Sequence, residues 1–182
     1  MNKKIIITVI LLALIGLATV SLVHDIAIHR DNQEKQTGKK AKVVRNTLQT
    51  APAIKLASNN GKVIQLSDFH GRTVLVTTWT TWCRECGKEL ETLNELSRQY
   101  SPDKLNVLAV NMTSEEASLA AVQRFLKQKS YSFPVLFDTN GQVKKDYAVY
   151  AIPQSFLIDP YGKIIHSFQG NVTKDEIGNW LP

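Results

Sequence analysis

Two cysteines, Cys83 and Cys86, are the residues of this 182-residue chain whose spacing points most directly to chemistry. They are the only cysteines in the sequence and stand three positions apart. They therefore cannot cross-link distant parts of the fold, as the disulfides of small secreted proteins do. A thiolate at one position can attack a disulfide in another molecule, and the second cysteine can then release the mixed disulfide. The pair therefore predicts thiol-disulfide exchange.

The sequence around the cysteines must place them for this chemistry. Residues 73–78 predict a buried strand, and residues 86–100 predict a helix. The apolar face of this helix is made by Leu90, Leu93 and Leu96. Cys83 is therefore expected at the helix N-terminus, where unpaired N–H groups and the helix dipole favour a thiolate. Cys86 follows one turn later, within reach of a mixed disulfide at Cys83.

Strand and helix patterns alternate through the rest of the chain. The expected strands are residues 105–111, 135–137, 155–158 and 163–168, and the expected helices are residues 115–129 and 173–181. Turn residues over 159–162 join the last two strands, so these should form an antiparallel hairpin. A βαβ unit followed by ββα predicts an α/β fold around a mixed central sheet.

The two later helices have recognisable caps. Thr113 or Ser114 is the expected cap of the first. Thr173 caps the second, with Glu176 as its capping-box partner. The residues expected to face the core from the first helix are Leu119, Val122, Phe125 and Leu126.

The positive charge of the chain is concentrated at its N-terminal end. The net charge is +6, yet residues 46–182 hold 14 Lys and Arg against 13 Asp and Glu, and residues 1–45 hold 8 against 3. The folded part thus gives little support to the basic stripe that nucleic-acid binding needs. No nucleic-acid partner is expected.

The N-terminal segment contains an uncharged apolar run of 19 residues, 5–23. As a helix at about 1.5 Å per residue it would be about 30 Å long, enough to span a bilayer. It is longer than the apolar stretch of a cleaved signal peptide, so an uncleaved anchor is predicted. Residues 1–23 are expected to be this anchor with a short cytoplasmic tail, 24–50 a basic flexible stalk, and 51–182 the folded domain.

The cysteine pair alone does not predict a metal site. Half of a zinc site has the same spacing, but the sequence has no second cysteine pair and its histidines are scattered. These histidines are His24, His29, His70 and His166. Neither a metal nor another cofactor is expected.

A proline stands at the entrance of the expected strand 155–158. Proline is disfavoured inside a sheet, and a cis Ile152–Pro153 bond usually serves a purpose at such an entrance. A trans proline at the end of a loop fits equally well, so the residues alone leave both open.

The chain after the stalk resembles the thioredoxin superfamily, and within it the membrane-anchored TlpA/ResA-like thiol-disulfide oxidoreductases. The resemblance covers essentially the whole of this part because several motifs occur in order. They are APAI (51–54), LSDFHG (66–71), WTTWCREC (79–86), IPQSFLID (152–159) and GKI (162–164). The resemblance implies a thioredoxin-like fold that exchanges electrons with protein cysteines without a cofactor.

The resemblance also implies a role for each site residue. Cys83 is expected to be the exposed attacking cysteine and Cys86 the buried resolving one. A cis Pro153, together with Trp82 and Ile152, is expected to shape the substrate groove beside them.

An acidic residue tunes the cysteine pKa values in ResA-like proteins, and Glu89 matches its position. The alternative is a solvated helix carboxylate, like Glu91 and Glu95 nearby. The sequence departs from the family at Glu85, which stands where proline is frequent. Its charge should oppose a Cys83 thiolate, whereas the neighbouring Arg84 should stabilise one, which leaves the direction of electron flow open.

The expected activity is the reduction of protein disulfides outside the membrane, fed by a membrane electron donor, in a role like that of cytochrome c maturation proteins. Six Lys and Arg follow the apolar run and two precede it, which alone would favour a cytoplasmic domain. The resemblance instead implies a single-pass protein of the cell membrane with an extracytoplasmic domain.

Three alternatives remain beside the reductant. An extracytoplasmic oxidant would use the same pair to form disulfides. A peroxiredoxin-like peroxidase needs a proline at position 76, where the chain has Val76, and a hydroxyl at position 80, which Thr80 supplies. A copper-delivery protein would have three residues between its cysteines, where this chain has two, and would add a histidine, for which His166 is the candidate.

Overall fold

The computed structural model describes residues 49–181. The predicted transmembrane helix over residues 5–23, and the predicted stalk up to residue 48, lie outside the described residues. No helix within residues 49–181 is long and apolar enough to cross a membrane.

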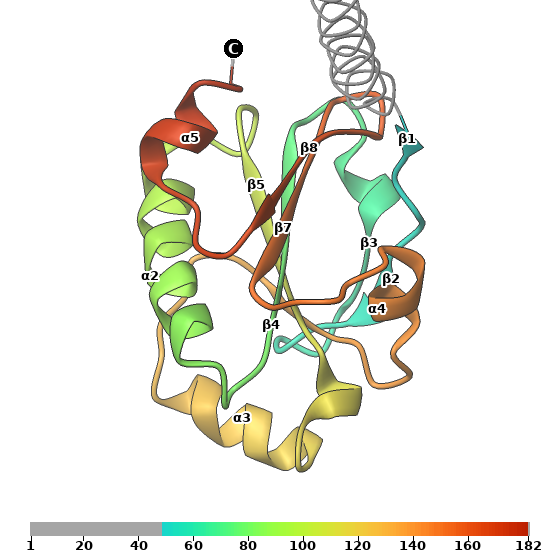
Figure 1. Ribbon diagram of the computed structural model, residues 1–182, viewed down its shortest axis with the longest axis vertical. Helices are drawn as coiled ribbons and strands as arrows, with labels where there is room; N and C mark the ends of the chain where they lie inside the picture. Colours follow the sequence, from blue (N-terminus) through green and yellow to red (C-terminus); the bar gives the residue numbers. More distant parts are fainter. Residues whose placement is uncertain (1–48, 182) are drawn as a thin grey trace, which may run out of the picture. The chain divides into compact units, whose positions relative to one another are not determined.

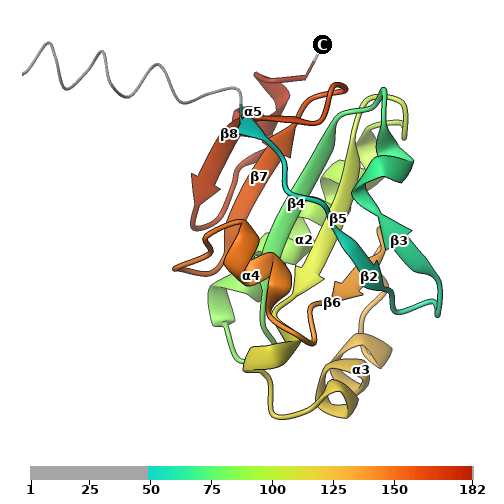
Figure 2. The same ribbon diagram turned by 90° about the vertical axis from the view of Figure 1, so that its right-hand side faces the viewer.

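A mixed sheet of six strands forms the centre of the domain, in the order β1-β8-β7-β4-β5-β6 (Figures 1 and 2). The strands are β1 (Gln49–Thr50), β4 (Val74–Trp79), β5 (Asn106–Asn111), β6 (Val135–Phe137), β7 (Gln154–Ile158) and β8 (Lys163–Gln169). β4, β5 and β6 run parallel, whereas β7 is antiparallel to β4 and β8 is antiparallel to β7. The predicted βαβ unit and the predicted hairpin are both confirmed.

Helices cover one face of the sheet, and a thinner layer covers the other. The elements outside the sheet are η1 (Leu66–Phe69), α2 (Arg84–Gln99), η2 (Thr113–Glu115), α3 (Leu119–Lys127), α4 (Gln142–Asp146), α5 (Lys174–Gly178) and the antiparallel pair β2 (Lys55–Ala57) and β3 (Val63–Gln65). Figure 1 shows the sheet between α2 and α5 on one side and α4, β2 and β3 on the other. The small α4, β2 and β3 were not predicted.

The central strand β4 is buried along its whole length. Its side chains alternate between two cores, with Leu75 and Trp79 packed beneath α2, and Val74 and Val76 packed on the opposite face. A strand covered on both faces reads as a continuous apolar run, which explains the sequence pattern. The end of β4 at Trp79 is therefore firmly held, and the cysteine loop begins there.

The prediction of a helix over residues 115–129 is wrong at its beginning, because α3 starts at Leu119. Glu116 is extended, and α3 begins only after Ser118, whose hydroxyl caps it. The expected cap, Thr113 or Ser114, lies in the 3₁₀ turn η2 instead. The extended stretch arises because the Glu116 side chain is engaged elsewhere, at the cysteine loop described below.

The core-facing prediction for this helix is correct only in part. Val122 is buried, and Phe125 and Leu126 pack partly buried against the same core, but Leu119 is exposed. A helix that begins late leaves its first residue at the rim of the core. The closing helix α5 is shorter than predicted, and its capping box is confirmed.

Candidate active site

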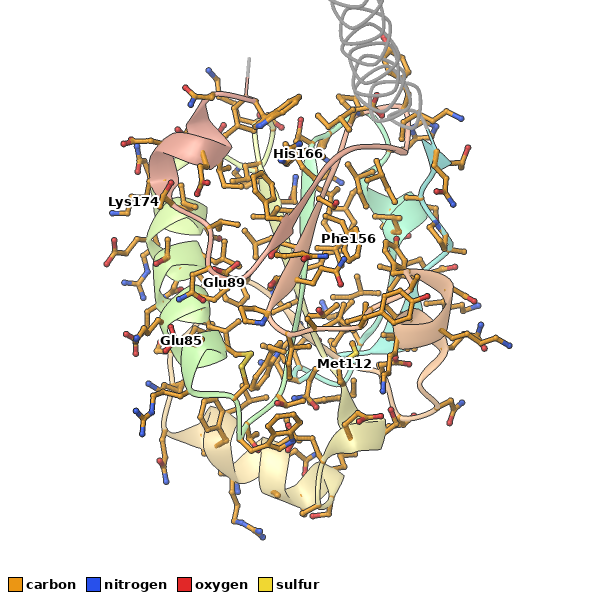
Figure 3. The ribbon with its side chains drawn as sticks, in the orientation of Figure 1. Glu85, Glu89, Met112, Phe156, His166 and Lys174 are labelled. Atoms are coloured by element: carbon orange, nitrogen blue, oxygen red, sulfur yellow. A yellow bond between two sulfur atoms is a disulfide. The ribbon has the colours of Figure 1, made fainter. Side chains whose placement is uncertain are left out.

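The cysteine pair stands where β4 gives way to α2. Cys83 is the N-cap residue of α2, and its sulfur accepts a hydrogen bond from the Cys86 N–H at 3.1 Å. It therefore faces the unpaired donors and the positive end of the helix dipole, as the sequence predicted. A disulfide joins Cys83 and Cys86 and is the yellow bond in Figure 3.

The two cysteines differ in their access to solvent. Cys86 lies on the buried face of α2 and has no exposed surface, whereas Cys83 is half-buried. The Cys83 Sγ lies 4.0 Å from the carbonyl oxygen of Ile152, whose bond to Pro153 is cis, as the resemblance implied. Trp82 is 63% exposed on the same rim. Another molecule can therefore reach Cys83 directly, while Cys86 can react only from inside.

Glu89 lies one turn after Cys86 on the buried face of α2 and has no exposed surface. Its carboxylate accepts hydrogen bonds from the Ser155 hydroxyl at 3.0 Å and from the Val172 N–H at 2.8 Å. Burial away from water raises the pKa of Glu89, although these hydrogen bonds lower it in part. Glu89 is thus unlike the solvated carboxylate that the sequence left as an alternative.

Glu85 lies one turn before Glu89, at the exposed N-terminal end of α2 (Figure 3). Its carboxylate pairs with Lys88 Nζ at 2.9 Å and accepts a hydrogen bond from Asn171 Nδ2 at 3.1 Å. The hydrogen bond from Lys88 is the main cause of a lowered pKa at Glu85. Lys88 also offsets part of the repulsion that Glu85 would exert on a Cys83 thiolate.

Comparison with known sequences places this site in a family. The profile of the AhpC/TSA family matches residues 47–167. The thiol-disulfide oxidoreductase ResA of Bacillus thuringiensis subsp. konkukian is 37% identical over 131 residues, which are 72% of this chain and 74% of that protein. A ResA of Bacillus cereus is 31% identical over 180 residues, 99% of this chain and 95% of that protein. The chain belongs to the AhpC/TSA family, among the ResA-like thiol-disulfide oxidoreductases.

Solved structures support the same conclusion. StoA of Bacillus subtilis superposes with a TM-score of 0.64 at 26% identity, covering 71% of this oxidoreductase and 96% of StoA. The exposed lipoprotein thioredoxin of Streptococcus pneumoniae gives a TM-score of 0.65 at 29% identity, covering 71% and 97%. The thioredoxin-like fold with a mixed sheet is therefore confirmed.

The six site residues predicted for this oxidoreductase lie at or beside one disulfide, which Cys83 and Cys86 form. Trp82 is exposed, and Cys83 and Ile152 are half-buried. The buried residues are Cys86, Glu89 and Pro153.

Sequence analysis missed Glu116, which holds the loop leading to Cys83. Glu116 Oε1 accepts hydrogen bonds from the Thr81 N–H at 2.6 Å and from Asn111 Nδ2 at 2.9 Å, and Oε2 accepts one from the Thr81 hydroxyl at 2.6 Å. Hydrogen bonds to a carboxylate are stronger than those between neutral groups. Thr81 and Glu116 are 35 positions apart, and no local pattern connects them.

The structure gives no support to peroxidase or copper-delivery chemistry. Val76 lies fully buried inside β4, where a peroxiredoxin motif would need proline. The His166 ring stacks on Trp180 with ring centroids 4.7 Å apart, and Figure 3 shows it well away from the disulfide. Within residues 49–181, no group of three or more His, Cys, Asp or Glu could hold a metal ion.

Proposed function

We propose that this oxidoreductase is a membrane-anchored reductant of disulfides in extracytoplasmic proteins. The observation that carries the proposal is the asymmetry of the pair. Cys83 is accessible beside Pro153, and Cys86 is buried with Glu89. This arrangement suits attack on a client by one sulfur and internal release of the client by the other.

The reaction follows from this asymmetry. In the reduced protein, the Cys83 thiolate attacks a client disulfide, forms a Cys83–client disulfide and releases one client thiolate. The Cys86 thiol then loses its proton, and its sulfur attacks Cys83 and releases the second client thiolate. Two electrons pass from the protein dithiol to the client, and the Cys83–Cys86 disulfide is left.

We assign the acceptance of the Cys86 proton to Glu89. The two residues are three positions apart on the buried face of α2, so they are neighbours on the helix surface. Burial raises the pKa of Glu89, which brings its basicity closer to that of a thiol and makes it a better proton acceptor. The hydrogen bonds from Ser155 and Val172 hold the carboxylate in place for this role.

The helix N-terminus at Cys83 favours a thiolate, but a buried carboxylate beside Cys86 supports a reductant. A site that stabilises the thiolate stabilises the reduced protein and makes the pair oxidising. Here the buried group beside Cys86 is the carboxylate of Glu89, which opposes a second negative charge. The similarity to ResA proteins points in the same direction, and a role like that in cytochrome c maturation is the setting we propose.

The proposed location rests on the sequence before the domain. Residues 5–23 are long and apolar enough for a transmembrane helix, and the match to the ResA of Bacillus cereus covers 99% of this chain. We place the domain outside the cell membrane, supplied with electrons by a membrane donor. A membrane-impermeant maleimide applied to intact cells under reducing conditions should label Cys83, and absence of labelling until lysis would place the domain inside.

The reduction potential of the Cys83/Cys86 couple tests the direction of electron flow. The full chain in detergent is equilibrated against dithiothreitol or glutathione buffers, and the fraction of free thiol is measured. A potential near or below about −250 mV supports a reductant. A potential above about −150 mV would make the protein an oxidant that introduces disulfides.

A further inference from the structure

We propose that an open cavity at the end of the domain remote from the cysteines binds an anionic phospholipid of the membrane. This inference rests on the proposed membrane anchor and specifies which surface of the domain meets the lipid. The cavity has a volume of about 360 Å³, within the usual range for small-molecule sites. Its lining comes from three segments, which lie within residues 50–55, 65–74 and 158–162.

The cavity and the cysteines lie at opposite ends of the central strands. Val74, the first residue of β4, lines the cavity, whereas Trp79, the last, leads into the loop to Cys83. Ile158 at the end of β7 also lines it, and the cis Pro153 lies just before the other end of that strand. Figure 1 shows β1 at the end of the sheet opposite to the beginning of α2. A ligand in this cavity therefore leaves Cys83 open to clients.

Hydrogen bonds tie the three lining segments to one another. The first segment is tied to the third by the Ala51 N–H, which donates to the Gly162 carbonyl at 2.9 Å. The second is tied to the third by His70 Nδ1, which donates to the Pro160 carbonyl at 2.9 Å. These bonds hold the cavity in shape, so a ligand does not have to order its walls.

The floor of the cavity is apolar. Ile54, Val74 and Ile158 are buried there, and Leu66 and Phe69 are half-buried. Apolar surface gains free energy when it is removed from water. The floor therefore suits the hydrocarbon part of a ligand.

Two cations, Lys55 and Arg72, line the same cavity. Neither pairs with a carboxylate within residues 49–181. The Arg72 guanidinium lies 5.2 Å from the centre of the Phe69 ring, and its Nη2 donates to the Asp68 carbonyl at 2.6 Å. A guanidinium has five N–H donors in a planar fork that matches the oxygens of a phosphate. Arg72 can therefore bind a phosphate with its other donors.

The carboxylate of Asp159 also lines the cavity, but it is engaged by its own turn. Its Oδ1 accepts hydrogen bonds from the Tyr161 N–H at 2.9 Å and the Lys163 N–H at 2.8 Å. The lining thus carries two cations against one carboxylate, beside an apolar floor. This combination matches an anionic phospholipid, whose head group meets the cations and whose acyl chain meets the floor.

The place of the cavity in the chain favours a membrane lipid over a soluble ligand. Thr50, the last residue of the predicted stalk over residues 24–50, lines the cavity. This stalk can reach at most about 100 Å when fully extended, so the predicted anchor keeps the domain close to the bilayer. The effective concentration of lipid at the cavity is therefore high. Tyr161 on the lining is 80% exposed, and tyrosine is enriched where proteins meet the membrane interface.

The test uses the full chain reconstituted into phosphatidylcholine vesicles with or without phosphatidylglycerol. Benzoylphenylalanine, a photoreactive amino acid, replaces Tyr161 in one sample and Tyr150, which is 92% exposed two residues before Ile152, in the other. Mass spectrometry after irradiation measures the fraction of protein bonded to lipid. Phosphatidylglycerol should raise this fraction about 10-fold at position 161, as expected for one or two cations meeting an anionic head group. The fraction at position 150 should stay low with either lipid.

Two pairs of variants make the test specific for the cavity. Arg72→Gln should lower the yield at position 161 about five-fold in phosphatidylglycerol, whereas Arg98→Gln should leave it unchanged. Arg98 is an exposed arginine of α2 that also donates to a backbone carbonyl. Ala53→Phe fills part of the cavity and should lower the yield, whereas Ala57→Phe changes an exposed alanine outside the lining and should not.

The outcomes separate this inference from the function on which it rests. Equal yields at the two positions, or a yield at position 161 that neither phosphatidylglycerol nor Arg72→Gln changes, would overturn the lipid site and leave the reductant in place. A cross-link from position 161 to a second copy of the chain instead of lipid would overturn it as well. A chain that does not float with the vesicles in a density gradient would overturn the proposed membrane anchor and the lipid site together.

Discussion

Two carboxylates of α2, Glu85 and Glu89, differ in almost every physical respect, although they are only one helical turn apart on the same side of the helix. Glu85 lies in solvent, pairs with Lys88, and has a lowered pKa. Glu89 lies in the core, accepts hydrogen bonds from neutral donors, and has a raised pKa. The difference shows that burial, more than the presence of a negative charge, decides what an acidic residue does beside a cysteine pair.

The cysteines divide in the same way between an accessible and a buried side. Cys83 meets the client at the surface, close to Glu85, and Cys86 completes the reaction inside, close to Glu89. Exposed charges are screened by water and salt, whereas buried charges are screened much less. Substitutions of the buried residues should therefore have the larger effects.

The largest effect should come from the cysteines themselves. Cys83→Ser should abolish turnover, because no thiolate reaches the client. Cys86→Ser should leave a mixed disulfide between Cys83 and a client, because nothing releases it. The trapped species should appear as a heavier band on a non-reducing gel and vanish with dithiothreitol. Loss of turnover in Cys86→Ser without any trapped species would argue against internal release.

Replacing the buried carboxylate should have the next largest effect. Glu89→Gln keeps the side-chain shape but cannot accept the Cys86 proton, so release of the client should slow by about 100-fold, the lower range for a positioned acid or base. Rapid-quench measurement of the mixed disulfide over a pH series would show the slower step. Glu91→Gln, an exposed change on the same helix, is the matched control and should release clients at the normal rate.

The same substitution should change how stability depends on pH. The pKa of Glu89 in the folded protein is raised above its ordinary value of 4.5. As the pH rises above 4.5, the Glu89 carboxyl group therefore loses its proton in the unfolded chain before it does so in the folded one. The contribution of Glu89 to the free energy of unfolding is therefore complete at pH values below about 4.5, and it falls as the pH rises through the pKa of Glu89 in the folded protein. Urea unfolding of oxidised Glu89→Gln should show a flatter pH dependence and greater stability at neutral pH. An unaltered pH profile would contradict a buried, pKa-shifted carboxylate.

Substitution of Glu116, whose side chain holds the loop before Cys83, should have a smaller effect. Glu116→Gln leaves one oxygen where the carboxylate has two, so at least one of the hydrogen bonds from Thr81 is lost. Loss of such a bond to a carboxylate should lower the free energy of unfolding by about 1.5 to 3 kcal/mol in urea titrations. Glu95→Gln changes an exposed carboxylate of α2 and should have little effect on the same measurement. Equal stability of the two variants would show that Glu116 does not hold the loop.

Local features of this site could be predicted from the sequence. The apolar run of β4 and the leucine spacing of α2 fix where the strand ends and the helix begins, and so place Cys83 at the helix N-terminus. The family motifs added the cis Pro153 and pointed to Glu89. Short-range patterns and shared motifs thus specified the cysteines and their immediate surroundings.

Features that depend on tertiary packing could not be predicted. Glu89 meets Val172 across 83 positions and Ser155 across 66, and no periodicity encodes either contact. The Glu116 hydrogen bonds to Thr81 are of the same kind, and they also displaced the expected start of α3. The helix α4 has five residues, which is too short for a repeating apolar pattern.

Substitution of the exposed residue Glu85 should give the smallest effect. Glu85→Gln removes a charge two residues from Cys83, which should favour the thiolate and speed attack on a small disulfide. Because Glu85 is exposed and paired with Lys88, the change should be less than about five-fold. Stopped-flow rates at low and high salt would test the cause, since screening should shrink the difference. A change in rate as large as that of Glu89→Gln, or one that salt leaves unaltered, would show that the exposed and buried carboxylates of α2 do not divide the chemistry as their burial predicts.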